Sequence, residues 1–498
     1  MNQIDHTTVS DELALHYHLM HPGGDSAPGD PNAAFYLDGV YHLHYILRHS
    51  WQDGEGQGKA SFSFVHVTSP DLLHWTWQNT KLQPAFTGHG MFSGTGFLTK
   101  EGRPAVIYHG QASGRNQIAL AKDNQLSAWE KPYPVEPKNR DGSEPDMYHW
   151  DPDCFLIGDT YYAISGGPNP PLIKSNDLKT WTVVGDFLRH EMPDVALGED
   201  ISCPNFFPIG NETTGEKWML LCISHPFGCR YYLGDWDAEA EQFVPERHGR
   251  MNWRRPEQSI YETNYRDFFA PESVLTPDGR RVMWAWLTTL HEAINLKSIQ
   301  SLPRELSLAG DGTLRIQPLR ELETLYDGEP VVFHNVTATP PDQPHSSAAT
   351  VPIADLDGDA LEIRITVDRA QAARKRFGVQ LFADAAHPGL PILLHPETGM
   401  VRVGSTEAPF AVADLAPGED VELRIFIDKY LVEVFANGRQ AVVTAYMAYQ
   451  AANGLRLYSY GAPTTLKTVE IRRLKATNQG FLAARTSKIW EPETSGQW

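Results

Sequence analysis

The sequence contains little cysteine, no long apolar run and no excess of basic charge. Four cysteines among 498 residues are too few for a disulfide framework, and their spacing matches no zinc pattern. No stretch is apolar over the length that a bilayer span needs, and the first residues lack the basic and apolar regions of a signal peptide. We therefore expect no metal, no cofactor, no membrane partner and a cytoplasmic location, or secretion if a leader has been trimmed.

The charge balance narrows the choice of partners further. The formal net charge is −20, and the isoelectric point is about 5.4. A nucleic-acid surface needs a basic stripe, so nucleic acid is not expected as a partner. A small neutral saccharide fits this charge, although many acidic proteins are acidic only for solubility. The composition leaves the oligomeric state open.

The first 310 residues have the pattern of an all-β domain. Short runs rich in aromatic residues alternate with turn signals, as where Asp38-Gly39 separates residues 34–37 from 40–45. Long helical periodicity is missing here. The pattern Ser-x-Asp-Leu-x-x-Trp occurs at Ser69 and again at Ser175, and such repeated β-meanders are typical of propeller blades.

A second β domain follows a boundary near residues 320–350. Residues 337–344 are rich in proline and polar side chains, which predicts a loop. Residues 360–367 and 421–428 then alternate between apolar and polar side chains, as strands of a sandwich with one wet face do. We predict a catalytic domain over residues 1–325, a linker over 326–350 and a β-sandwich over 351–498.

Three motifs in the first domain place a carboxylate close to a proline. They are Gly29-Asp30-Pro31-Asn32, Trp150-Asp151-Pro152 and the run from Glu199 and Asp200 through Ser202-Cys203-Pro204. Proline favours strand starts and turns, where carboxylates from different strands can converge on one pocket. Two converging carboxylates are what cleavage of a glycosidic bond requires. Any one of these motifs alone would be read as a turn, but the three in order favour an active site.

The ordered set of motifs resembles glycoside hydrolase family 32, the invertase, inulinase and levanase group. Further matching segments are Phe92-Ser93-Gly94-Thr95, Asp267-Phe268-Phe269-Ala270, Leu302-Pro303-Arg304-Glu305-Leu306, Phe426-Ile427-Asp428 and residues 432–438. The resemblance implies a five-bladed β-propeller followed by a C-terminal β-sandwich. It also implies that Asp30 is the nucleophile and Asp151 the transition-state stabiliser. The substrate contacts expected from it are Asn32, Phe92, Ser93, Trp150, Cys203 and Glu272.

Two departures from the family pattern affect the chemistry. Trp150 stands where the family has an arginine, so a stacking face and one N–H replace several donors. Ser202 stands where the family has its acid/base glutamate, and a hydroxyl cannot act as a carboxylic acid near neutral pH. An extended segment would turn Asp200 to the face of Ser202, whereas a bulge would re-aim Glu199. We rank Glu199 slightly above Asp200 as the acid/base, with Glu272 third.

The function predicted from these features is retaining hydrolysis that releases fructose from sucrose, fructo-oligosaccharides or fructans. In that reaction one carboxylate attacks the anomeric carbon while an acid protonates the leaving oxygen. The departures keep two alternatives open. One is another enzyme of the same fold, a fructosyltransferase or an arabinofuranosidase. The other is a catalytically weak fructan-binding protein.

Overall fold

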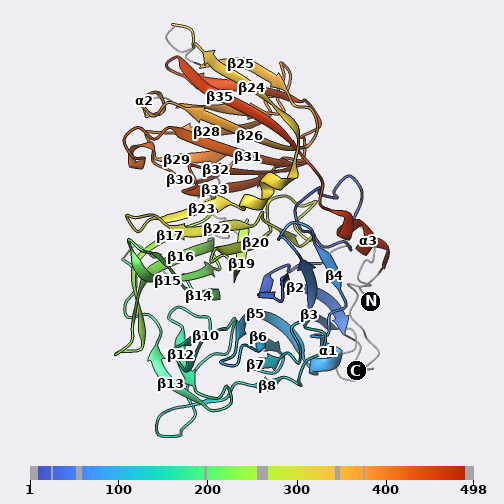
Figure 1. Cartoon of the computed structure of the whole chain (residues 1–498), viewed down its shortest axis with the longest axis vertical. Coiled ribbons are helices and arrows are strands. Elements are labelled where there is room, and N and C mark those ends of the chain that lie inside the picture. The colour runs from blue at the N-terminus through green and yellow to red at the C-terminus, as the bar shows by residue number, and fades with distance from the viewer. Residues whose placement is uncertain are drawn as a thin grey trace.

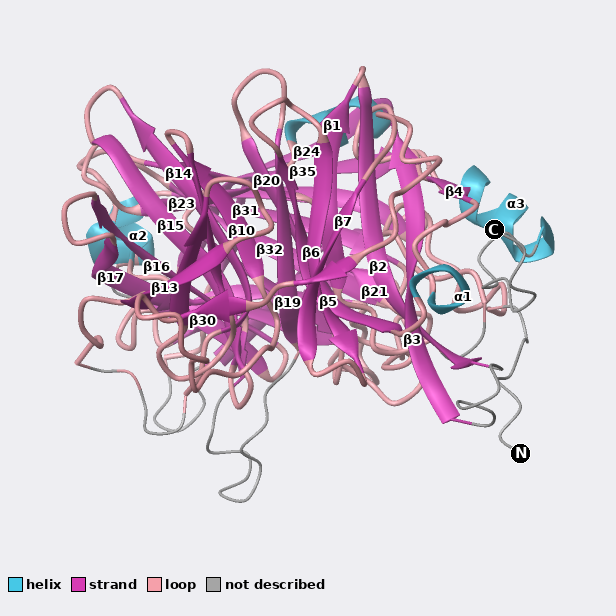
Figure 2. Ribbon diagram, turned by 90° about the horizontal axis from the view of Figure 1, so that it is seen from below, coloured by secondary structure: helices cyan, strands magenta, loops and turns pink. Residues whose placement is uncertain are grey.

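The computed structural model describes most of the chain and is built almost entirely of β-strands (Figure 1, Figure 2). The described residues are 9–23, 26–51, 59–193, 195, 199–254, 267–342, 348–373 and 376–487. Figure 1 shows two stacked regions, one that holds strands β1 to β17 and β19 to β23 and one that holds β24 to β35. The predicted all-β fold class is confirmed.

Five sheets follow one another in chain order in the first region. The first two are β1 (Pro31–Leu37), β2 (Val40–Trp51), β3 (Lys59–Ser69) and β4 (Thr76–Gln78), then β5 (Gly90–Leu98), β6 (Pro104–Gln111), β7 (Arg115–Leu120) and β8 (Tyr133–Pro134). The third is β10 (Asp153–Ile157), β11 (Thr160–Ile164), β12 (Pro171–Ser175) and β13 (Trp181–Asp186), with β9 (Pro137–Lys138) at its edge. The fourth is β14 (Ser202–Asn211), β15 (Gly215–Ser224), β16 (Gly228–Asp237) and β17 (Gln242–Arg250). The fifth is β19 (Phe268–Leu275), β20 (Arg281–Leu287), β22 (Arg304–Leu308) and β23 (Leu314–Pro318), with β21 (Ile299–Gln300) beside β20. Five consecutive meanders of this kind fit the five-bladed propeller.

The Ser-x-Asp-Leu-x-x-Trp repeat forms the same turn in two blades. It joins β3 to β4 in the first sheet and β12 to β13 in the third. Asp71 Oδ1 accepts the N–H of Leu73 at 3.0 Å, and Asp177 Oδ1 accepts the N–H of Lys179 at 2.9 Å. The leucine after each aspartate has a positive φ, and the tryptophan that ends each repeat is buried. The repeat is therefore a capped turn at one fixed place in a blade.

The second region is a sandwich of two sheets. One sheet contains β24 (Tyr326–Ala338), β35 (Thr464–Leu474), β26 (Ala360–Val367), β31 (Val421–Asp428), β32 (Leu431–Ala436) and β33 (Gln440–Ala445). The other contains β30 (Thr406–Pro409), β29 (Met400–Val403), β28 (Leu390–His395), β27 (Arg376–Leu381), β34 (Gly454–Tyr460) and β25 (Ala348–Asp355), with β18 (Trp253–Arg254) at its edge.

The segment between the two regions differs from the predicted linker. The sequence predicts a linker over residues 326–350, but residues 326–338 form β24 and pair with β35 in the sandwich. Their side chains are mostly exposed, so the stretch lacks the apolar pattern that marks a buried strand. The boundaries of the two domains otherwise stay predictions.

Helices are few and short in the described part of the chain. They are α1 (Pro84–Thr87), α2 (Arg369–Ala372), α3 (Gln479–Ser487) and the 3₁₀ turns η2 (Arg320–Leu325) and η3 (Val412–Asp414). Helix α3 returns from the sandwich to the first sheet, where the ring of Phe481 contacts that of Trp77 (Figure 1). None of the helices among these residues has the length and apolar character to cross a membrane.

A buried charged cluster fastens the propeller to the sandwich. Asp428, at the end of β31, accepts the backbone N–H groups of His16, Tyr17 and His18 at 2.8–3.0 Å. His18 Nδ1 also lies 2.8 Å from Asp428. Burial alone would lower the pKa of His18, but its hydrogen bonds to carboxylates of the sandwich raise that pKa to about 9. The cluster therefore holds a charged imidazole at neutral pH.

A second carboxylate completes this junction cluster. Glu433, on β32, accepts the N–H of Leu302 and one N–H of Arg304, each at 2.8 Å. Both side chains of the Arg304–Glu433 pair are fully buried. Arg304, Asp428 and Glu433 all belong to segments that resemble family motifs, so these motif residues join the two domains.

Candidate active site

The inner strands of the five sheets begin at one end of the propeller, and the predicted acidic residues lie at these beginnings. Asp30 directly precedes β1, Asp151 lies two residues before β10, and Ser202 is the first residue of β14. Hydrogen bonds show that these starts converge. Ser93, on β5, donates to Asp30 Oδ2 at 3.0 Å, and the hydroxyl of Ser202 donates to Asp151 Oδ2.

A recurring backbone irregularity aims these residues inward. The pairing register of four inner strands shifts near their starts, at residues 32–35, 91–94, 202–205 and 269–271. Ala33, Cys203 and Ala270 lie within these shifts with φ between 43° and 48°, and Asp151 has φ of 28°. A bulge breaks the strict alternation of side chains and points extra ones at the propeller axis. Positive φ at residues other than glycine costs free energy, and such strain gathers at functional sites.

Cys203 lies between the two aspartates. Its Sγ is 3.7 Å from Ser93 Oγ and 3.5 Å from Asp151 Oδ2. Burial raises the pKa of this thiol well above its usual range, so it remains a neutral S–H donor. Ser93 and Cys203, each predicted as a substrate contact, therefore link the nucleophile candidate to Asp151 and help to orient both carboxylates.

Both aspartates are buried, and the side-chain hydrogen bonds described above engage only one oxygen of each. Burial, reinforced by the charge of Asp151, raises the pKa of Asp30 to about 7, although the bond from Ser93 opposes the rise. Burial also raises the pKa of Asp151, against the bond from Ser202. The Oδ1 atom of each has no hydrogen-bond partner among the described residues. An unsatisfied buried oxygen costs free energy, which a hydroxyl of a bound substrate would recover.

Aromatic rings form a wall beside Asp151. The ring of Trp150 lies 5.4 Å from that of Phe92 and 4.9 Å from that of His109, and Phe92 packs on Phe62. Trp150 is 38% exposed, which leaves a face open to a ligand. The predicted pair Phe92 and Trp150 thus lies where a sugar ring could stack next to the carboxylates.

The structure places Glu199 in a different environment from the one its predicted role needs. Its buried carboxylate is bound by the guanidinium groups of Arg230 and Arg250, the latter through two hydrogen bonds. Two cationic partners favour the ionised carboxylate, which is the wrong form for a general acid. We therefore revise the ranking that put Glu199 first as acid/base and assign it a structural role.

Asp200 is bound to a histidine. Its Oδ1 accepts the N–H of His225 at 2.8 Å, and its Oδ2 lies 2.6 Å from His225 Nδ1. Partial burial would raise the pKa of Asp200, but the bonds from His225 lower it. Asp200 is therefore an ionised acceptor rather than a proton donor. His225 was missed from the sequence because nothing local pairs it with a carboxylate 25 residues earlier.

Asn32 lies within β1 and Glu272 within β19, whereas Asp30 and Asp151 precede their strands. Hydrogen bonds at this level join the inner strands of neighbouring blades, in the pairs Asn32–Gly94, Thr95–Asp153, Asp153–Phe206 and Asn205–Glu272. The amide of Asn32 accepts from Gly94 and donates to the backbone of Asp30, so it positions the nucleophile candidate. Burial raises the pKa of Glu272 to about 8, and its Oε2 has no partner among the described residues.

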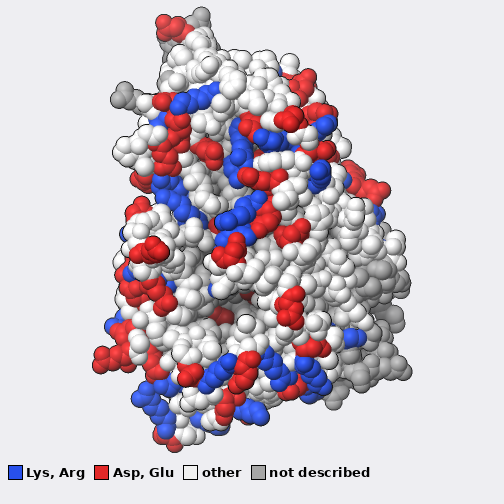
Figure 3. Space-filling view, in the orientation of Figure 1, with Lys and Arg blue, Asp and Glu red and all other residues white. Residues whose placement is uncertain are grey.

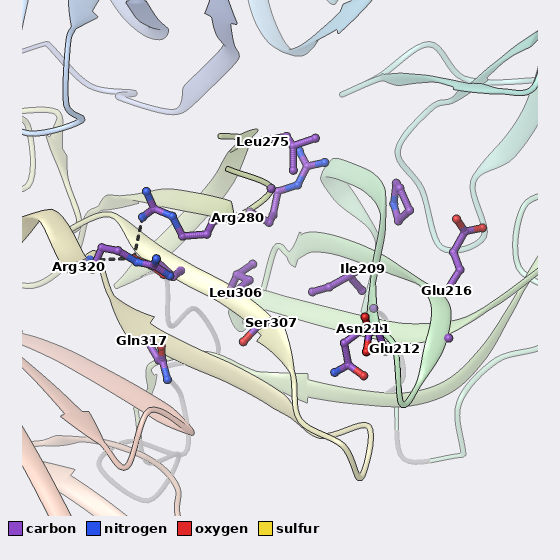
Figure 4. A pocket seen from close by; sticks show the side chains of 16 residues that line it. Ile209, Asn211, Glu212, Glu216, Leu275, Arg280, Leu306, Ser307, Gln317 and Arg320 are labelled. Atoms are coloured by element: carbon purple, nitrogen blue, oxygen red, sulfur yellow. Dashed lines mark hydrogen bonds and ion pairs between the residues drawn. The ribbon is translucent and has the colours of Figure 1, made fainter. Parts of the chain in front are cut away.

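A separate cavity lies at the opposite end of the inner strands (Figure 4). It is lined by the end of β14, around Ile209 and Asn211, whereas Ser202 begins that strand. At about 3.3 Å per residue, the two ends of β14 are roughly 30 Å apart. Arg280 and Arg320, which line this cavity, are both paired with Glu305. The cavity is therefore distinct from the carboxylate site, and two of the arginines that line it, Arg280 and Arg320, already have a carboxylate partner.

Comparison with known proteins agrees with this architecture. Residues 26–318 match the N-terminal domain of the glycosyl hydrolases family 32, and residues 321–474 match the C-terminal domain of that family. A levanase of Bacillus subtilis is 26% identical, with 90% of this chain and 68% of that protein covered. A probable sucrose-6-phosphate hydrolase of Psychromonas ingrahamii is also 26% identical, with 88% and 77% covered.

Solved structures share the fold over nearly the whole chain. The exo-inulinase of Aspergillus awamori superposes with a TM-score of 0.69 at 17% identity, and 93% of this chain and 98% of that chain are covered. Fructan 1-exohydrolase IIa of Cichorium intybus gives a TM-score of 0.68 at 18% identity, with 94% and 98% covered. Because the two family domains together match most of its length, the chain belongs to family 32 of the glycosyl hydrolases.

Proposed function

We propose that this chain is a retaining β-fructofuranosidase that releases fructose from sucrose, fructo-oligosaccharides or fructans. The observation that carries the proposal is the convergence of Asp30 and Asp151 at the starts of the inner strands, each with one unpartnered buried oxygen. The relatives named levanase, raffinose invertase and fructan 6-exohydrolase support the same substrate class.

The roles of the two aspartates follow from their surroundings. Asp30 would attack the anomeric carbon of a fructosyl unit and form a covalent intermediate, which water then hydrolyses. Ser93 and Asn32 hold Asp30 for this attack. Asp151 would bind ring hydroxyls and stabilise the positive charge that develops on the sugar. Trp150 and Phe92 would stack on the substrate beside them.

The surface charge supports a neutral substrate. On the face shown in Figure 3, Lys and Arg side chains are interspersed with Asp and Glu rather than gathered into a basic stripe. Such a surface offers no extended anion-binding field on that face. A neutral saccharide needs none, because hydroxyl groups and ring faces carry its recognition.

Product analysis tests the proposal and its alternatives. The purified chain is incubated with sucrose, inulin, levan and an aryl arabinofuranoside, and the products are separated and identified. We expect free fructose from at least one of the first three substrates. New, longer oligosaccharides would instead assign a fructosyltransferase, and cleavage of only the arabinofuranoside would assign another furanosidase. Binding without turnover would make the chain a fructan-binding protein, as the serine at position 202 allows.

A further inference from the structure

The proposed reaction needs a proton donor, and none of the predicted residues can serve. Ser202, at the place of the family's glutamate, is fully buried and donates its hydroxyl to Asp151. Glu199 is held by two arginines. Glu272 lies inside the strand layer, where its Oε1 accepts from Asn205 and Ser273. The acid must therefore come from a residue outside the family's pattern.

We propose that His225, oriented by Asp200, is the general acid and base of this enzyme. The inference rests on the proposed function, since it supplies the proton that fructoside cleavage requires. His225 would be the catalytic residue that touches the leaving oxygen, and Asp200 a positioning residue.

The topology of the fourth blade places this pair at the right end of the propeller. Strands β14 and β15 are antiparallel, and Ser202 pairs with Ile223. His225 follows Ile223 by two residues, and Asp200 precedes Ser202 by two. Both residues therefore extend past the start of β14, on the side where Asp30 and Asp151 lie.

His225 is near both aspartates and accessible from outside. Its charge favours the ionised forms of Asp30 and Asp151 and so acts to lower the pKa of each. Its ring meets that of Phe269, at the start of β19, edge to face at 5.9 Å. The imidazole side chain is 38% exposed, so a substrate held by the two aspartates can reach it.

The hydrogen bonds assign the two nitrogens of His225 different roles. Nδ1 lies 2.6 Å from Asp200 Oδ2 and donates its proton to that ionised carboxylate. The proton to be transferred is therefore carried on Nε2. The carboxylate also stabilises the imidazolium form, as an aspartate does beside a catalytic histidine. The backbone bond from His225 N to Asp200 fixes the ring's position further.

The two chemical steps balance with this assignment. In the first, an Asp30 oxygen forms a bond to the anomeric carbon while the glycosidic C–O bond breaks. The leaving oxygen keeps that electron pair and takes the Nε2 proton, so His225 becomes neutral. In the second, Nε2 takes a proton from water as the water oxygen bonds to the anomeric carbon, and the bond to Asp30 breaks with its electron pair returning to the carboxylate.

A comparison of leaving groups tests the role of His225. We expect His225→Ala to lower kcat/KM for sucrose or fructan by about 10²–10⁴-fold, because a sugar alkoxide leaves poorly without a proton. With an activated aryl fructoside such as the 4-nitrophenyl compound, intermediate formation should change less than about 10-fold. The intermediate should then accumulate and give a burst of nitrophenol. Added azide, which attacks without a base, should restore steady turnover and yield fructosyl azide.

A matched pair on the surface provides the control. Asp71 and His74 in the first blade repeat the same geometry, with His74 N 2.9 Å from Asp71 Oδ1 and Nδ1 2.7 Å from Oδ2. His74→Ala should leave kcat/KM for sucrose or fructan unchanged, and it should also leave the rate of intermediate formation from the aryl fructoside unchanged. Asp200→Asn should show the same leaving-group dependence as His225→Ala, but with a smaller loss.

Each outcome decides between the two proposals. Equal losses on sucrose and on the aryl fructoside, or a folded His225→Ala variant that azide does not rescue, would overturn the role of His225 and leave the β-fructofuranosidase proposal standing. Absence of turnover by the wild-type chain on every furanoside tested would overturn both.

Discussion

The buried carboxylates at the starts of the inner strands differ from those at the junction with the sandwich in what binds their oxygens. Asp30 and Asp151 accept only from neutral groups, and each keeps an oxygen without a partner among the described residues. Asp428 and Glu433 are bound to His18 and Arg304 as well as to backbone N–H groups. Burial raises the pKa of the first pair, whereas their cationic partners lower the pKa of the second despite burial.

This difference distinguishes buried carboxylates that can act on a substrate from buried carboxylates that hold the fold together. A fully buried carboxylate that is paired with a cation has its charge already compensated, so removing either partner mainly destabilises the fold. A carboxylate without such a partner is costly in the free protein, and where it lies at the site, as Asp30 and Asp151 do, a bound ligand can offset that cost. By this criterion Glu199, between Arg230 and Arg250, belongs with the junction residues rather than with the catalytic ones.

The largest expected effect is on catalysis at Asp30. Asp30→Asn keeps the size of the side chain but removes the nucleophile, so we expect kcat/KM for fructosides to fall about 10⁴-fold or more. Steady-state kinetics with an unchanged circular dichroism spectrum would check this. In the wild type, kcat/KM should rise as the pH increases through about 7, because the attacking form of Asp30 is the ionised one. Wild-type-like activity in the pure variant would remove Asp30 from the mechanism.

At the junction between the two domains, a substitution should lower stability and leave catalysis nearly unchanged. Glu433→Gln leaves the guanidinium of Arg304 buried without its counter-charge, so the free energy of unfolding should drop by about 3–5 kcal/mol. Urea denaturation measures this loss. The kcat of the folded variant should stay close to that of the wild type. A large fall in kcat without a loss of stability would show that the two groups of carboxylates are not separate.

The role proposed for Asp151 can be distinguished from that of Asp30 by its effects on kcat and KM. We expect Asp151→Asn to lower kcat by about 10²–10³-fold and to change KM much less, because its contacts strengthen mainly in the transition state. Initial rates across a range of sucrose or fructan concentrations separate the two parameters. A change confined to KM would instead make Asp151 a residue that binds substrate and transition state equally.

The sequence was sufficient for the fold class, and it pointed to two aspartates that lie at the starts of inner strands. Alternating apolar runs and Asp-Gly turns predicted the strands, and the ordered Asp-Pro motifs pointed to carboxylates that the structure brings together. The strand over residues 326–338 escaped prediction because its exposed face gives no apolar signal. The role of Asp30 and Asp151 in catalysis remains a prediction from geometry and resemblance.

The acid/base was harder to predict because its partners lie far apart in the chain. The alternation of side chains along an extended segment cannot reveal that Arg230 and Arg250 bind Glu199. These two arginines lie on β16 and β17 of the same blade. Nor can it reveal that His225 returns to Asp200 after a hairpin. Both pairings are set by strand register, which a single sequence specifies only weakly when a bulge intervenes.

The smallest expected effect concerns the pH dependence of stability. Burial raises the pKa of Glu272 from 4.5 to about 8, so the folded protein binds more protons than the unfolded chain between these pH values. The free energy of unfolding of the wild type should therefore fall across this window, and Glu272→Gln should remove that fall. Relative to wild type, the variant should gain roughly 1–4 kcal/mol between pH 5 and pH 9, measured by urea denaturation.

Glu362, buried against Arg364 and Arg424, is the matched control, because burial there is outweighed by two cations that lower its pKa. Its stabilisation is present above pH 4.5 and lost as the pH falls, so Glu362→Gln should be less stable than wild type throughout the same range. A gain for Glu272→Gln that did not vary with pH would mean that packing, not ionisation, sets the cost of this carboxyl.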